Sequence, residues 1–362
     1  MSLSVRLAHS FAGFALDLAF EAPAGVTALF GRSGSGKTTI VNAVAGLLRP
    51  NAGRIEAEGV TLFDSETGLF VPPHRRRIGY VFQEARLFPH LSVRANLLYG
   101  RRFAPRGEAG AEFARIVDLL GVGALLSRRP GGLSGGERSR VALGRAILSK
   151  PRLLLMDEPL AALDEARKAE IMPYLERLRD EIRLPILYVS HSAAEIARLA
   201  TTVVMIEGGR VAAAGPAVEM MADPAAAPAF GLREAGALLP ARVEAQEADG
   251  LTRLASRAGP LWLPRIEAPP GATLRVRILA QDVMLALGRP EAVSALNILP
   301  AKVAEIRIGE GPGALVRLDA GGEALLARVT RRSAAALGLE PGREVFAVIK
   351  AVSVAPGAVG AG

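Results

Sequence analysis

The sequence predicts an α/β domain with a mostly parallel sheet, followed by a smaller domain that contains only strands. In residues 1–230, short apolar runs alternate with helical stretches, which is typical of a parallel sheet covered on both faces. In residues 239–355, strand-like segments are instead broken repeatedly by Gly and Pro. We therefore expect a linker at 231–238 and a disordered tail at 356–362.

The elements of the first part follow from local composition. A short apolar run bounded by turn residues predicts a buried strand, and apolar residues at helical spacing predict a helix. The expected strands are 26–30, 78–82, 152–156, 186–189 and 203–206, and the expected helices are 37–48, 137–148 and 163–183.

The second part contains an internal repeat. The segment at 239–243 (LPARV) matches 299–303 (LPAKV), and the Pro-Gly pair at 270–271 matches the pair at 341–342. The offsets are 60 and 71, so the second copy has eleven extra residues between the matched segments. We expect two similar halves that pack into one β domain, and the alternative is chance similarity among Val-rich strands. The expected halves are 239–290 and 294–355.

Composition excludes several classes of protein. No stretch of about 18 uncharged apolar residues is present, so we expect no membrane-spanning helix, and the start of the chain lacks the layout of a signal peptide. The absence of cysteine excludes disulfides and cysteine-ligated metals and fits a reducing compartment. The net charge of +8 indicates a generally basic surface or attraction to an anionic membrane. No basic stripe with interleaved aromatic residues points to nucleic acid.

A glycine-rich octapeptide follows the first expected strand. Its glycines let the chain curl so that backbone N–H groups point at a phosphate, and the next helix adds its N-terminal dipole. In this pattern Lys37 reaches the β- and γ-phosphates of ATP, and the Thr38 hydroxyl is a ligand of Mg²⁺. The expected nucleotide-binding residues here are Gly31, Arg32, Ser33, Gly34, Ser35, Gly36, Lys37, Thr38 and Thr39.

Two adjacent acidic residues end an expected buried strand. Asp157 follows four apolar residues, so the strand delivers its carboxylate to the shell of the Mg²⁺ ion. Glu158 comes next, where a carboxylate orients and polarises the attacking water. The alternative for Glu158 is a surface charge at a strand end. With the phosphate loop in place, the pair predicts hydrolysis of ATP.

Three further motifs fit the same chemistry. Ser134 is a natural helix N-cap, and its hydroxyl together with the following N–H groups forms a second cradle for the γ-phosphate. Gln83 ends a strand, where its amide can contact the Mg²⁺ ion or the water; His191 follows another strand and can donate to the γ-phosphate. Taken alone, Gln83 is an ordinary loop residue and His191 a structural one. The second cradle consists of Leu133, Ser134, Gly135, Gly136 and Glu137.

In this order the motifs resemble the ATP-binding cassette (ABC) transporter ATPases, and the resemblance covers the whole first domain. It implies the fold of a P-loop NTPase and a head-to-tail homodimer. In such a dimer Ser134 and Gly136 act on the ATP of the partner, and Asp164 lies at the dimer contact. The family also has an adenine-stacking aromatic residue near the N-terminus. We assign this role to Phe11, whereas Phe14 fits the core equally well.

The segment from Gln83 to His90 resembles the importers of this family, in which it meets a helix of the membrane permease. Segments 294–303 and 325–330 resemble the Mop-type, OB-like regulatory β domain of molybdate importers. The resemblance implies an ATP-hydrolysing subunit that drives uptake of molybdate, with tungstate as a second cargo. It also implies permease subunits as partners, a periplasmic substrate-binding protein acting through them, and a place on the cytoplasmic face of the inner membrane.

The resemblance to Mop-type domains implies an oxyanion site in the second domain. One departure is that Leu296 stands where these domains commonly have arginine, so the candidate ligands are Ser294, Asn297 and Lys302. Importers of sulfate, iron or sugar share the cassette and are the alternatives for the cargo. A soluble ABC ATPase is a further alternative, but it predicts two fused cassettes or a coiled-coil insertion, and the sequence has neither.

Overall fold

The computed structural model describes residues 3–103, 109–161, 163–182, 184–309, 311–354 and 358–361. The chain forms two compact units. The first contains the residues up to 191 together with 199–214, and the second contains 192–198 together with the residues from 215 onward. The phosphate loop lies in the first unit and the expected β domain in the second.

The second unit begins earlier in the chain than we expected. Two short helices, α7 (Ala217–Met221) and α8 (Ala227–Phe230), precede its first strand. Ala222, directly after α7, and Ala227 in α8 are buried in the apolar cores of the β domain. The expected linker at 231–238 is also partly strand, because β12 starts at Gly236.

The centre of the first unit is a six-stranded sheet in the order β11-β10-β3-β9-β8-β7. The strands from β10 to β7 in this order pair in parallel, as the sequence predicts. Parallel pairing brings the carboxyl ends of β3, β8 and β9 to one edge of the sheet. Ligand-binding sites of open α/β folds form at this edge. The strands are β3 (Val26–Phe30), β7 (Ile78–Val81), β8 (Leu153–Asp157), β9 (Ile186–Ser190), β10 (Thr202–Glu207) and β11 (Arg210–Pro216).

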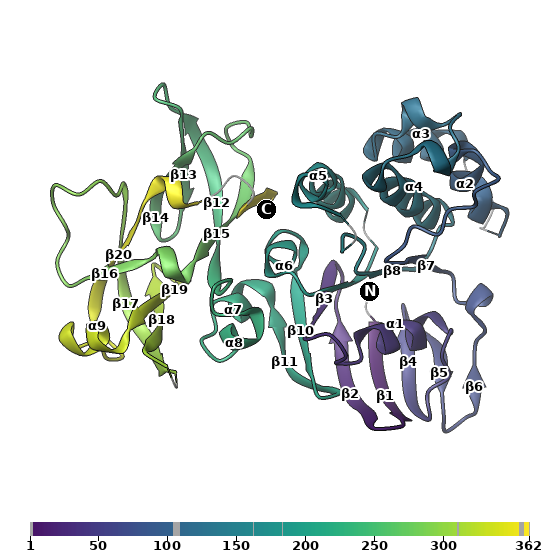
Figure 1. The fold of residues 1–362 in the computed structure, drawn as a ribbon, viewed down its shortest axis with the longest axis horizontal. Coiled ribbons are helices and arrows are strands. Elements are labelled where there is room, and N and C mark those ends of the chain that lie inside the picture. Colours follow the sequence, from purple (N-terminus) through teal and green to yellow (C-terminus); the bar gives the residue numbers. More distant parts are fainter. Residues whose placement is uncertain are drawn as a thin grey trace. The chain divides into compact units, whose positions relative to one another are not determined.

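Both faces of this sheet are buried. Along β8, Leu153 and Leu155 belong to one core and Leu154 and Met156 to another, because successive side chains of a strand point to opposite faces. The first core includes α1, and the second includes α2 to α5; Figure 1 shows α2, α3 and α4 gathered together. Burial on both sides explains why the strand is a continuous apolar run.

The helices of this part are short. The longest described one has 17 residues, and no helix in the described ranges is long and apolar enough to cross a membrane. The α-helices of the first unit are α1 (Lys37–Ala45), α2 (Val93–Tyr99), α3 (Ala109–Leu119), α4 (Gly135–Leu148) and α5 (Glu165–Glu181). The next helix, α6 (Ala193–Leu199), belongs to the second unit except for its last residue. The 3₁₀ turns are η1 (Pro73–Arg75), η2 (Gly100–Phe103), η3 (Gly123–Leu125) and η4 (Pro130–Gly132).

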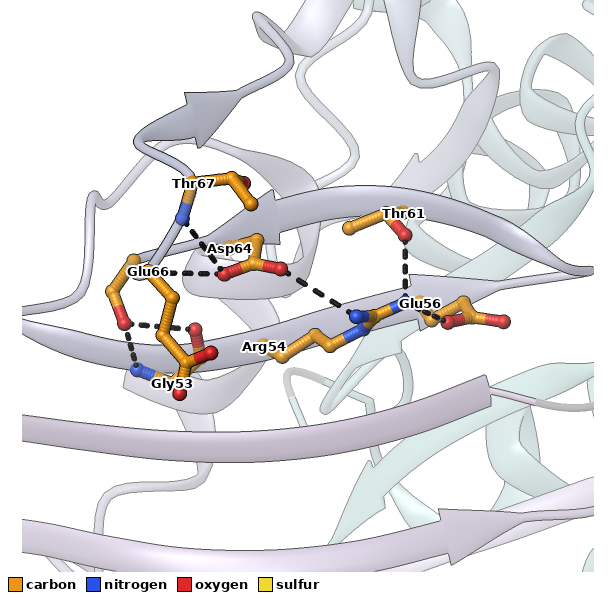
Figure 2. A network of polar contacts seen from close by, with 8 residues as sticks. Gly53, Arg54, Glu56, Thr61, Asp64, Glu66 and Thr67 are labelled. Atoms are coloured by element: carbon orange, nitrogen blue, oxygen red, sulfur yellow. Dashed lines mark hydrogen bonds and ion pairs between the residues drawn. The ribbon is translucent and has the colours of Figure 1, made fainter.

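An antiparallel sheet in the order β2-β1-β4-β5-β6 packs into the same core as α1. Figure 2 shows a polar network at its surface, in which Arg54 contacts Glu56 at 3.0 Å and Thr61 at 3.2 Å. Arg54 also lies 3.5 Å from Asp64, whose other oxygen accepts from the Glu66 N–H and closes the turn after β5. The network therefore fixes a turn. The strands are β1 (Leu3–Phe11), β2 (Phe14–Ala22), β4 (Ala52–Ala57), β5 (Val60–Asp64) and β6 (Leu69–Phe70).

Helix ends differ from the predicted ones for identifiable reasons. α1 ends at Ala45 rather than at residue 48, because Gly46 adopts a left-handed φ of 80° and its N–H caps the helix. α4 begins at Gly135 rather than at residue 137, because Ser134 is its N-cap.

Two five-stranded antiparallel sheets form the second unit, as the all-β prediction requires. Their orders are β14-β13-β12-β15-β21 and β16-β20-β17-β18-β19, and one apolar core contains side chains from both. The strands of the first sheet are β12 (Gly236–Gln246), β13 (Leu251–Ser256), β14 (Gly259–Pro264), β15 (Thr273–Leu279) and β21 (Val359–Ala361). Those of the second are β16 (Met284–Ala286), β17 (Asn297–Ile308), β18 (Gly313–Ala320), β19 (Glu323–Thr330) and β20 (Glu344–Ile349).

The two sheets correspond strand by strand. Leu239 pairs with Val276 in the first sheet, and Leu299 pairs with Ala347 in the second, with the same offsets of 60 and 71 that the sequence repeat has. A β-bulge lies at the same place in both copies, between β12 and β13 and between β17 and β18. The second half also contains an α-helix, α9 (Arg331–Ala336), within its longer stretch, whereas the first half has only a 3₁₀ turn, η5 (Ala280–Asp282).

Each half contributes its last strand to the sheet of the other half. β16 pairs with β20, and β21 pairs with β15 (Figure 1). This corrects the expectation of a disordered tail at 356–362, because Val359 to Ala361 form β21 and Val359 is buried in the core. The edge of β15 offers unpaired backbone groups that the tail satisfies. Residues 355–357 and 362 lie outside the described residues.

Candidate active site

The loop between β3 and α1 has the shape of a phosphate cradle. Gly34 and Gly36 have φ angles of 81° and 100°, which favour glycine. A Cβ atom on Gly36 would lie 2.5 Å from Leu16, and one on Gly31 would lie 2.2 Å from the Ile206 carbonyl oxygen. The loop opens into a cavity of about 430 Å³. This cavity is lined by Phe11, Phe14, Ser33, Gly34, Gly36, Lys37, Thr38, Thr39 and Glu158.

Lys37 lies folded into this loop. Its Nζ donates to the carbonyl oxygens of Gly31 at 2.7 Å and Arg32 at 2.9 Å. Burial lowers the pKa of Lys37, and the nearby carboxylates of Glu158 and Asp157 oppose that shift. The ammonium group is thus held by loop oxygens at the position where nucleotide phosphates would compete for it.

Asp157 has a hydroxyl group beside each of its carboxylate oxygens. Its Oδ1 lies 3.4 Å from Thr38 Oγ1, and its Oδ2 lies 3.4 Å from Tyr80 Oη. Burial raises the pKa of Asp157, and the hydrogen bond from Thr38 acts in the opposite direction. Tyr80 Oη is also 3.1 Å from Asn42 Oδ1 on α1. The predicted pair of Thr38 and Asp157 is therefore together, with Tyr80 as an unexpected third member.

Glu158 and His191 also meet at this edge of the sheet. Glu158 has a φ of 46°, which is a strained conformation for a residue other than glycine and is characteristic of functional sites. Its N–H donates to the Val189 carbonyl oxygen at 3.1 Å, which fixes the turn after β8. The Glu158 Oε2 atom lies 3.5 Å from His191 Nδ1, and both side chains are accessible to solvent.

Gln83 is exposed and borders a second groove of about 520 Å³ instead of the phosphate-loop cavity. Residues 133–137 of the second cradle, which we call the signature residues, lie at the start of α4, the signature helix. This helix holds the residues that follow Gln83. Arg145 donates to the carbonyl oxygens of Arg86 at 2.9 Å and Ala85 at 3.3 Å, and its guanidinium lies 5.1 Å from the Phe88 ring centroid. The Gln83 loop and the signature helix are therefore linked within one chain.

The signature residues form the start of α4. Ser134 and Glu137 make a capping box, in which the Glu137 carboxylate accepts from the Ser134 N–H at 2.7 Å and Ser134 Oγ accepts from the Glu137 N–H at 3.2 Å. Gly135 borders the second groove, and a Cβ on it would lie 3.0 Å from Leu163. None of the signature residues lines the phosphate-loop cavity, so one chain does not bring the two cradles together.

Two further predicted residues, Asp164 and Phe11, lie outside the phosphate loop and the signature. Asp164 is the N-cap of α5, where its carboxylate accepts from the Arg167 N–H at 2.9 Å. Phe11 is 44% exposed at the phosphate-loop cavity and packs edge-on against His9. Phe14 lines the same cavity but also packs against the core, which fits the alternative that we gave for it.

The three candidate oxyanion ligands lie in different environments. Ser294 and Lys302 are exposed. Asn297 is only 1% exposed, and its amide bonds the backbone of Trp262 on β14 in both directions, accepting from the N–H at 2.7 Å and donating to the carbonyl at 3.0 Å. In contrast to our expectation, the Asn297 side chain is thus occupied by a bridge between the two sheets.

Several residues at the site were not predicted from the sequence. They are Tyr80 and Asn42 beside Asp157, and Arg145 and Asn96 around the Gln83 loop. Asn96 is fully buried on α2, where its amide bonds both the N–H and the carbonyl oxygen of Phe88. The only signal in the sequence is a polar residue on an otherwise apolar helix face, and such a residue does not identify its partner.

Comparisons with known proteins agree with this fold. The ABC transporter family model matches residues 16–161, and the TOBE domain model matches residues 293–356. The chain is 27% identical to cbiO1 of Clostridium perfringens, part of the ABC transporter complex cbiONQ, with a TM-score of 0.54 over 64% of this chain and 94% of that one. It also shares the fold of the bacterial ABC transporter cassette MJ0796, at 24% identity and a TM-score of 0.51, over 60% of this chain and 99% of that one.

Relatives of full length are closer in sequence. The molybdenum import ATP-binding protein ModC of Mesorhizobium japonicum is 54% identical over 100% of this chain and 98% of its own length. That of Rhizobium meliloti is 56% identical over 98% of this chain and 99% of its own length. The chain therefore belongs to the ABC transporter ATPases and, within them, to the family of the molybdenum import ATP-binding proteins.

Proposed function

We propose that this chain hydrolyses ATP to drive molybdate uptake, as a homodimer bound to permease subunits on the cytoplasmic face of the inner membrane. The observation that carries the proposal is the convergence of Lys37, Asp157 and Glu158 at one edge of the parallel sheet, with Lys37 poised in the loop. The choice of molybdate, with tungstate as an analogue, rests on the full-length relatives.

The residues present fit a magnesium ion bound with ATP. Thr38 Oγ1 and Asp157 Oδ1 are 3.4 Å apart beside the phosphate loop, and hydroxyl and carboxylate oxygens are the donors that Mg²⁺ prefers. When bound, Mg²⁺ would neutralise negative charge on the phosphate oxygens. Thr38 and Asp157 would hold it, and Gln83 would approach it only after the exposed loop moves inward.

The side chains then have distinct roles. Lys37 exchanges the loop carbonyls for β- and γ-phosphate oxygens, and the N–H groups of the loop bind the same phosphates. Glu158 orients the attacking water and withdraws its proton. His191, 3.5 Å from Glu158, steadies that carboxylate and donates to the γ-phosphate.

A second copy of the chain completes each site. The signature residues of one chain lie outside its own phosphate-loop cavity. The capping box does not use the N–H groups of Gly135 and Gly136, which therefore suit a γ-phosphate from a partner at the α4 N-terminus. Asp164 and Phe11 are exposed and therefore available for the dimer contact and for adenine, respectively. The Gln83 loop faces the permease, and the permease receives molybdate from a periplasmic binding protein.

We further propose that the β domain senses cytosolic oxyanion through the exposed Ser294 and Lys302, without Asn297. Both exposed side chains can donate hydrogen bonds to an oxyanion, and Lys302 adds positive charge. Binding there would restrain the transport cycle when molybdate is plentiful.

The test is ATP hydrolysis by the chain reconstituted in liposomes with its permease and periplasmic binding protein. Molybdate-loaded binding protein should stimulate hydrolysis several-fold, whereas sulfate should not, and Glu158→Gln should abolish the stimulated rate. Equal stimulation by sulfate, or stimulation by iron or sugar alone, would reject molybdate as the cargo. Full hydrolysis by the Glu158→Gln complex would reject the assigned mechanism.

A further inference from the structure

Tyr80 belongs to none of the motifs, yet its hydroxyl reaches the carboxylate of Asp157. It lies on β7 opposite Leu155 of β8 and faces the core that contains α1. Its ring is stacked on that of Phe82, with the centroids 4.0 Å apart and the planes 20° apart. Packing therefore fixes the ring, and the hydroxyl lies between α1 and the end of β8.

The hydroxyl has two oxygen neighbours but only one proton. Tyr80 Oη lies 3.1 Å from Asn42 Oδ1 and 3.4 Å from Asp157 Oδ2. A carboxylate can only accept, whereas a carboxamide can donate through its other atom. All three groups are satisfied when the Asn42 amide is assigned the other way round, with Nδ2 in the place of Oδ1. Asn42 then donates to Tyr80 Oη, and Tyr80 donates to Asp157.

This bond determines which carboxylate oxygen remains for a ligand. Asp157 Oδ2 is directed toward Tyr80, so Oδ1 is directed toward Thr38 Oγ1 and the phosphate loop. Without a donor on Oδ2, Thr38 would be the remaining side-chain hydrogen-bond partner of the Asp157 carboxylate among the described residues, and the carboxylate could rotate away from the loop. Loss of a group that holds a metal ligand in orientation typically lowers metal affinity by about 10–100-fold.

We propose that Tyr80 is a positioning residue, which holds the Asp157 carboxylate so that Oδ1 and Thr38 together receive the cation of the bound nucleotide. The inference rests on the proposed role of Thr38 and Asp157 toward Mg²⁺. The alternative is that Tyr80 is only an aromatic residue of the core, and in that case its hydroxyl is dispensable.

The substitution Tyr80→Phe distinguishes the positioning role from a purely structural one, because it keeps the ring and its stacking on Phe82 and removes only the hydroxyl. The full chain is titrated with a fluorescent ATP analogue, first in EDTA and then with increasing Mg²⁺. We expect the affinity in EDTA to stay within about twofold. The Mg²⁺ concentration at half-saturation should rise about tenfold, as for the loss of other groups that orient metal ligands. The thermal midpoint of the nucleotide-free protein should stay close to that of the wild type.

Tyr174→Phe is the matched control, because it removes a phenolic hydroxyl from a half-buried ring that packs under Arg140. It should leave the Mg²⁺ dependence unchanged. Asn42→Leu should raise the half-saturating Mg²⁺ concentration less than Tyr80→Phe, and the double variant should resemble Tyr80→Phe alone, since Asn42 acts through Tyr80.

An unchanged Mg²⁺ dependence in Tyr80→Phe would overturn the inference, as would an equal loss of affinity in EDTA and in Mg²⁺. Asp157→Asn distinguishes this failure from failure of the proposed function. If Asp157→Asn removes the Mg²⁺ dependence and Tyr80→Phe does not, only the positioning role is wrong. If Asp157→Asn leaves the dependence intact, the cation site itself is wrong.

Discussion

Replacing Asn297 by alanine removes a side chain that joins the two sheets of the β domain. Asn297 lies on β17 of one sheet and bonds Trp262 on β14 of the other. β14 is an edge strand that pairs only with β13. The Asn297 amide therefore satisfies a backbone N–H and a carbonyl that have no strand on that side.

The expected loss follows from these two bonds. Each buried backbone group left unpaired costs about 1–3 kcal/mol, and the lower end applies where water can reach it. Trp262 is only partly buried, so we expect Asn297→Ala to lower the free energy of unfolding by about 2–4 kcal/mol in total. For a unit of this size, a loss of about 3 kcal/mol lowers the thermal midpoint by roughly 6–12 °C.

The assay is unfolding of the full chain followed by intrinsic tryptophan fluorescence. Trp262 is the single tryptophan of the chain, so its emission reports on the β domain alone. Ser294→Ala is the control, because it changes an exposed polar side chain of the same neighbourhood and should shift stability by less than about 0.5 kcal/mol.

Molybdate added to each variant tests the competing role of Asn297 as an oxyanion ligand. If Asn297→Ala keeps the wild-type midpoint but loses stabilisation by molybdate, the structural role derived from its two bonds is refuted. If the midpoint falls and the stabilisation by molybdate is kept, the amide serves the fold.

Four more predictions concern both units. Glu158→Gln should reduce ATP hydrolysis at least about 100-fold while a fluorescent ATP analogue still binds, and a residual rate near wild type would contradict its role as the base. Gly36→Ala should abolish nucleotide binding, because its φ of 100° and the approach of Leu16 exclude a Cβ; unchanged binding in the same titration would refute this. Arg145→Lys should loosen the Gln83 loop, because lysine cannot make both hydrogen bonds of the guanidinium. Amide hydrogen exchange at residues 84–88 should then increase, and an unchanged exchange rate would contradict the role of Arg145. Val359→Asp should lower the free energy of unfolding of the β domain by about 3 kcal/mol or more, measured by tryptophan fluorescence. An unchanged free energy of unfolding would show that β21 is dispensable.

The phosphate loop and the strands around it could be predicted because their signals are local. The glycines of the loop, Lys37 and Thr38 lie within one octapeptide, and the positive φ angles of Gly34 and Gly36 favour glycine through the local backbone alone. Asp157 could be placed for a similar reason, since a strand buried on both faces is a continuous apolar run that ends at the site.

The remaining contacts depend on partners that are distant in the sequence. Arg145 meets carbonyl oxygens 59 and 60 residues earlier in the chain, and Asn297 meets Trp262 35 residues earlier. Backbone carbonyl groups accept such bonds at any residue type, so no pattern in the sequence marks the acceptor. The tail strand β21 was missed because two of its three residues, Gly360 and Ala361, have low strand propensity, and the free edge of β15 decides its conformation.

The exchange of strands makes the two halves of the β domain one cooperative unit. If the first sheet unfolded alone, β21 would lose its partner and β16 would remain as a lone strand of that half on the second sheet. The shared core, which contains Leu239 from one half and Leu299 from the other, would be exposed at the same time. Since neither half retains a closed core without the other, the domain should unfold in one transition. Trp262 fluorescence therefore reports on both halves, including the exchanged strand that carries Val359.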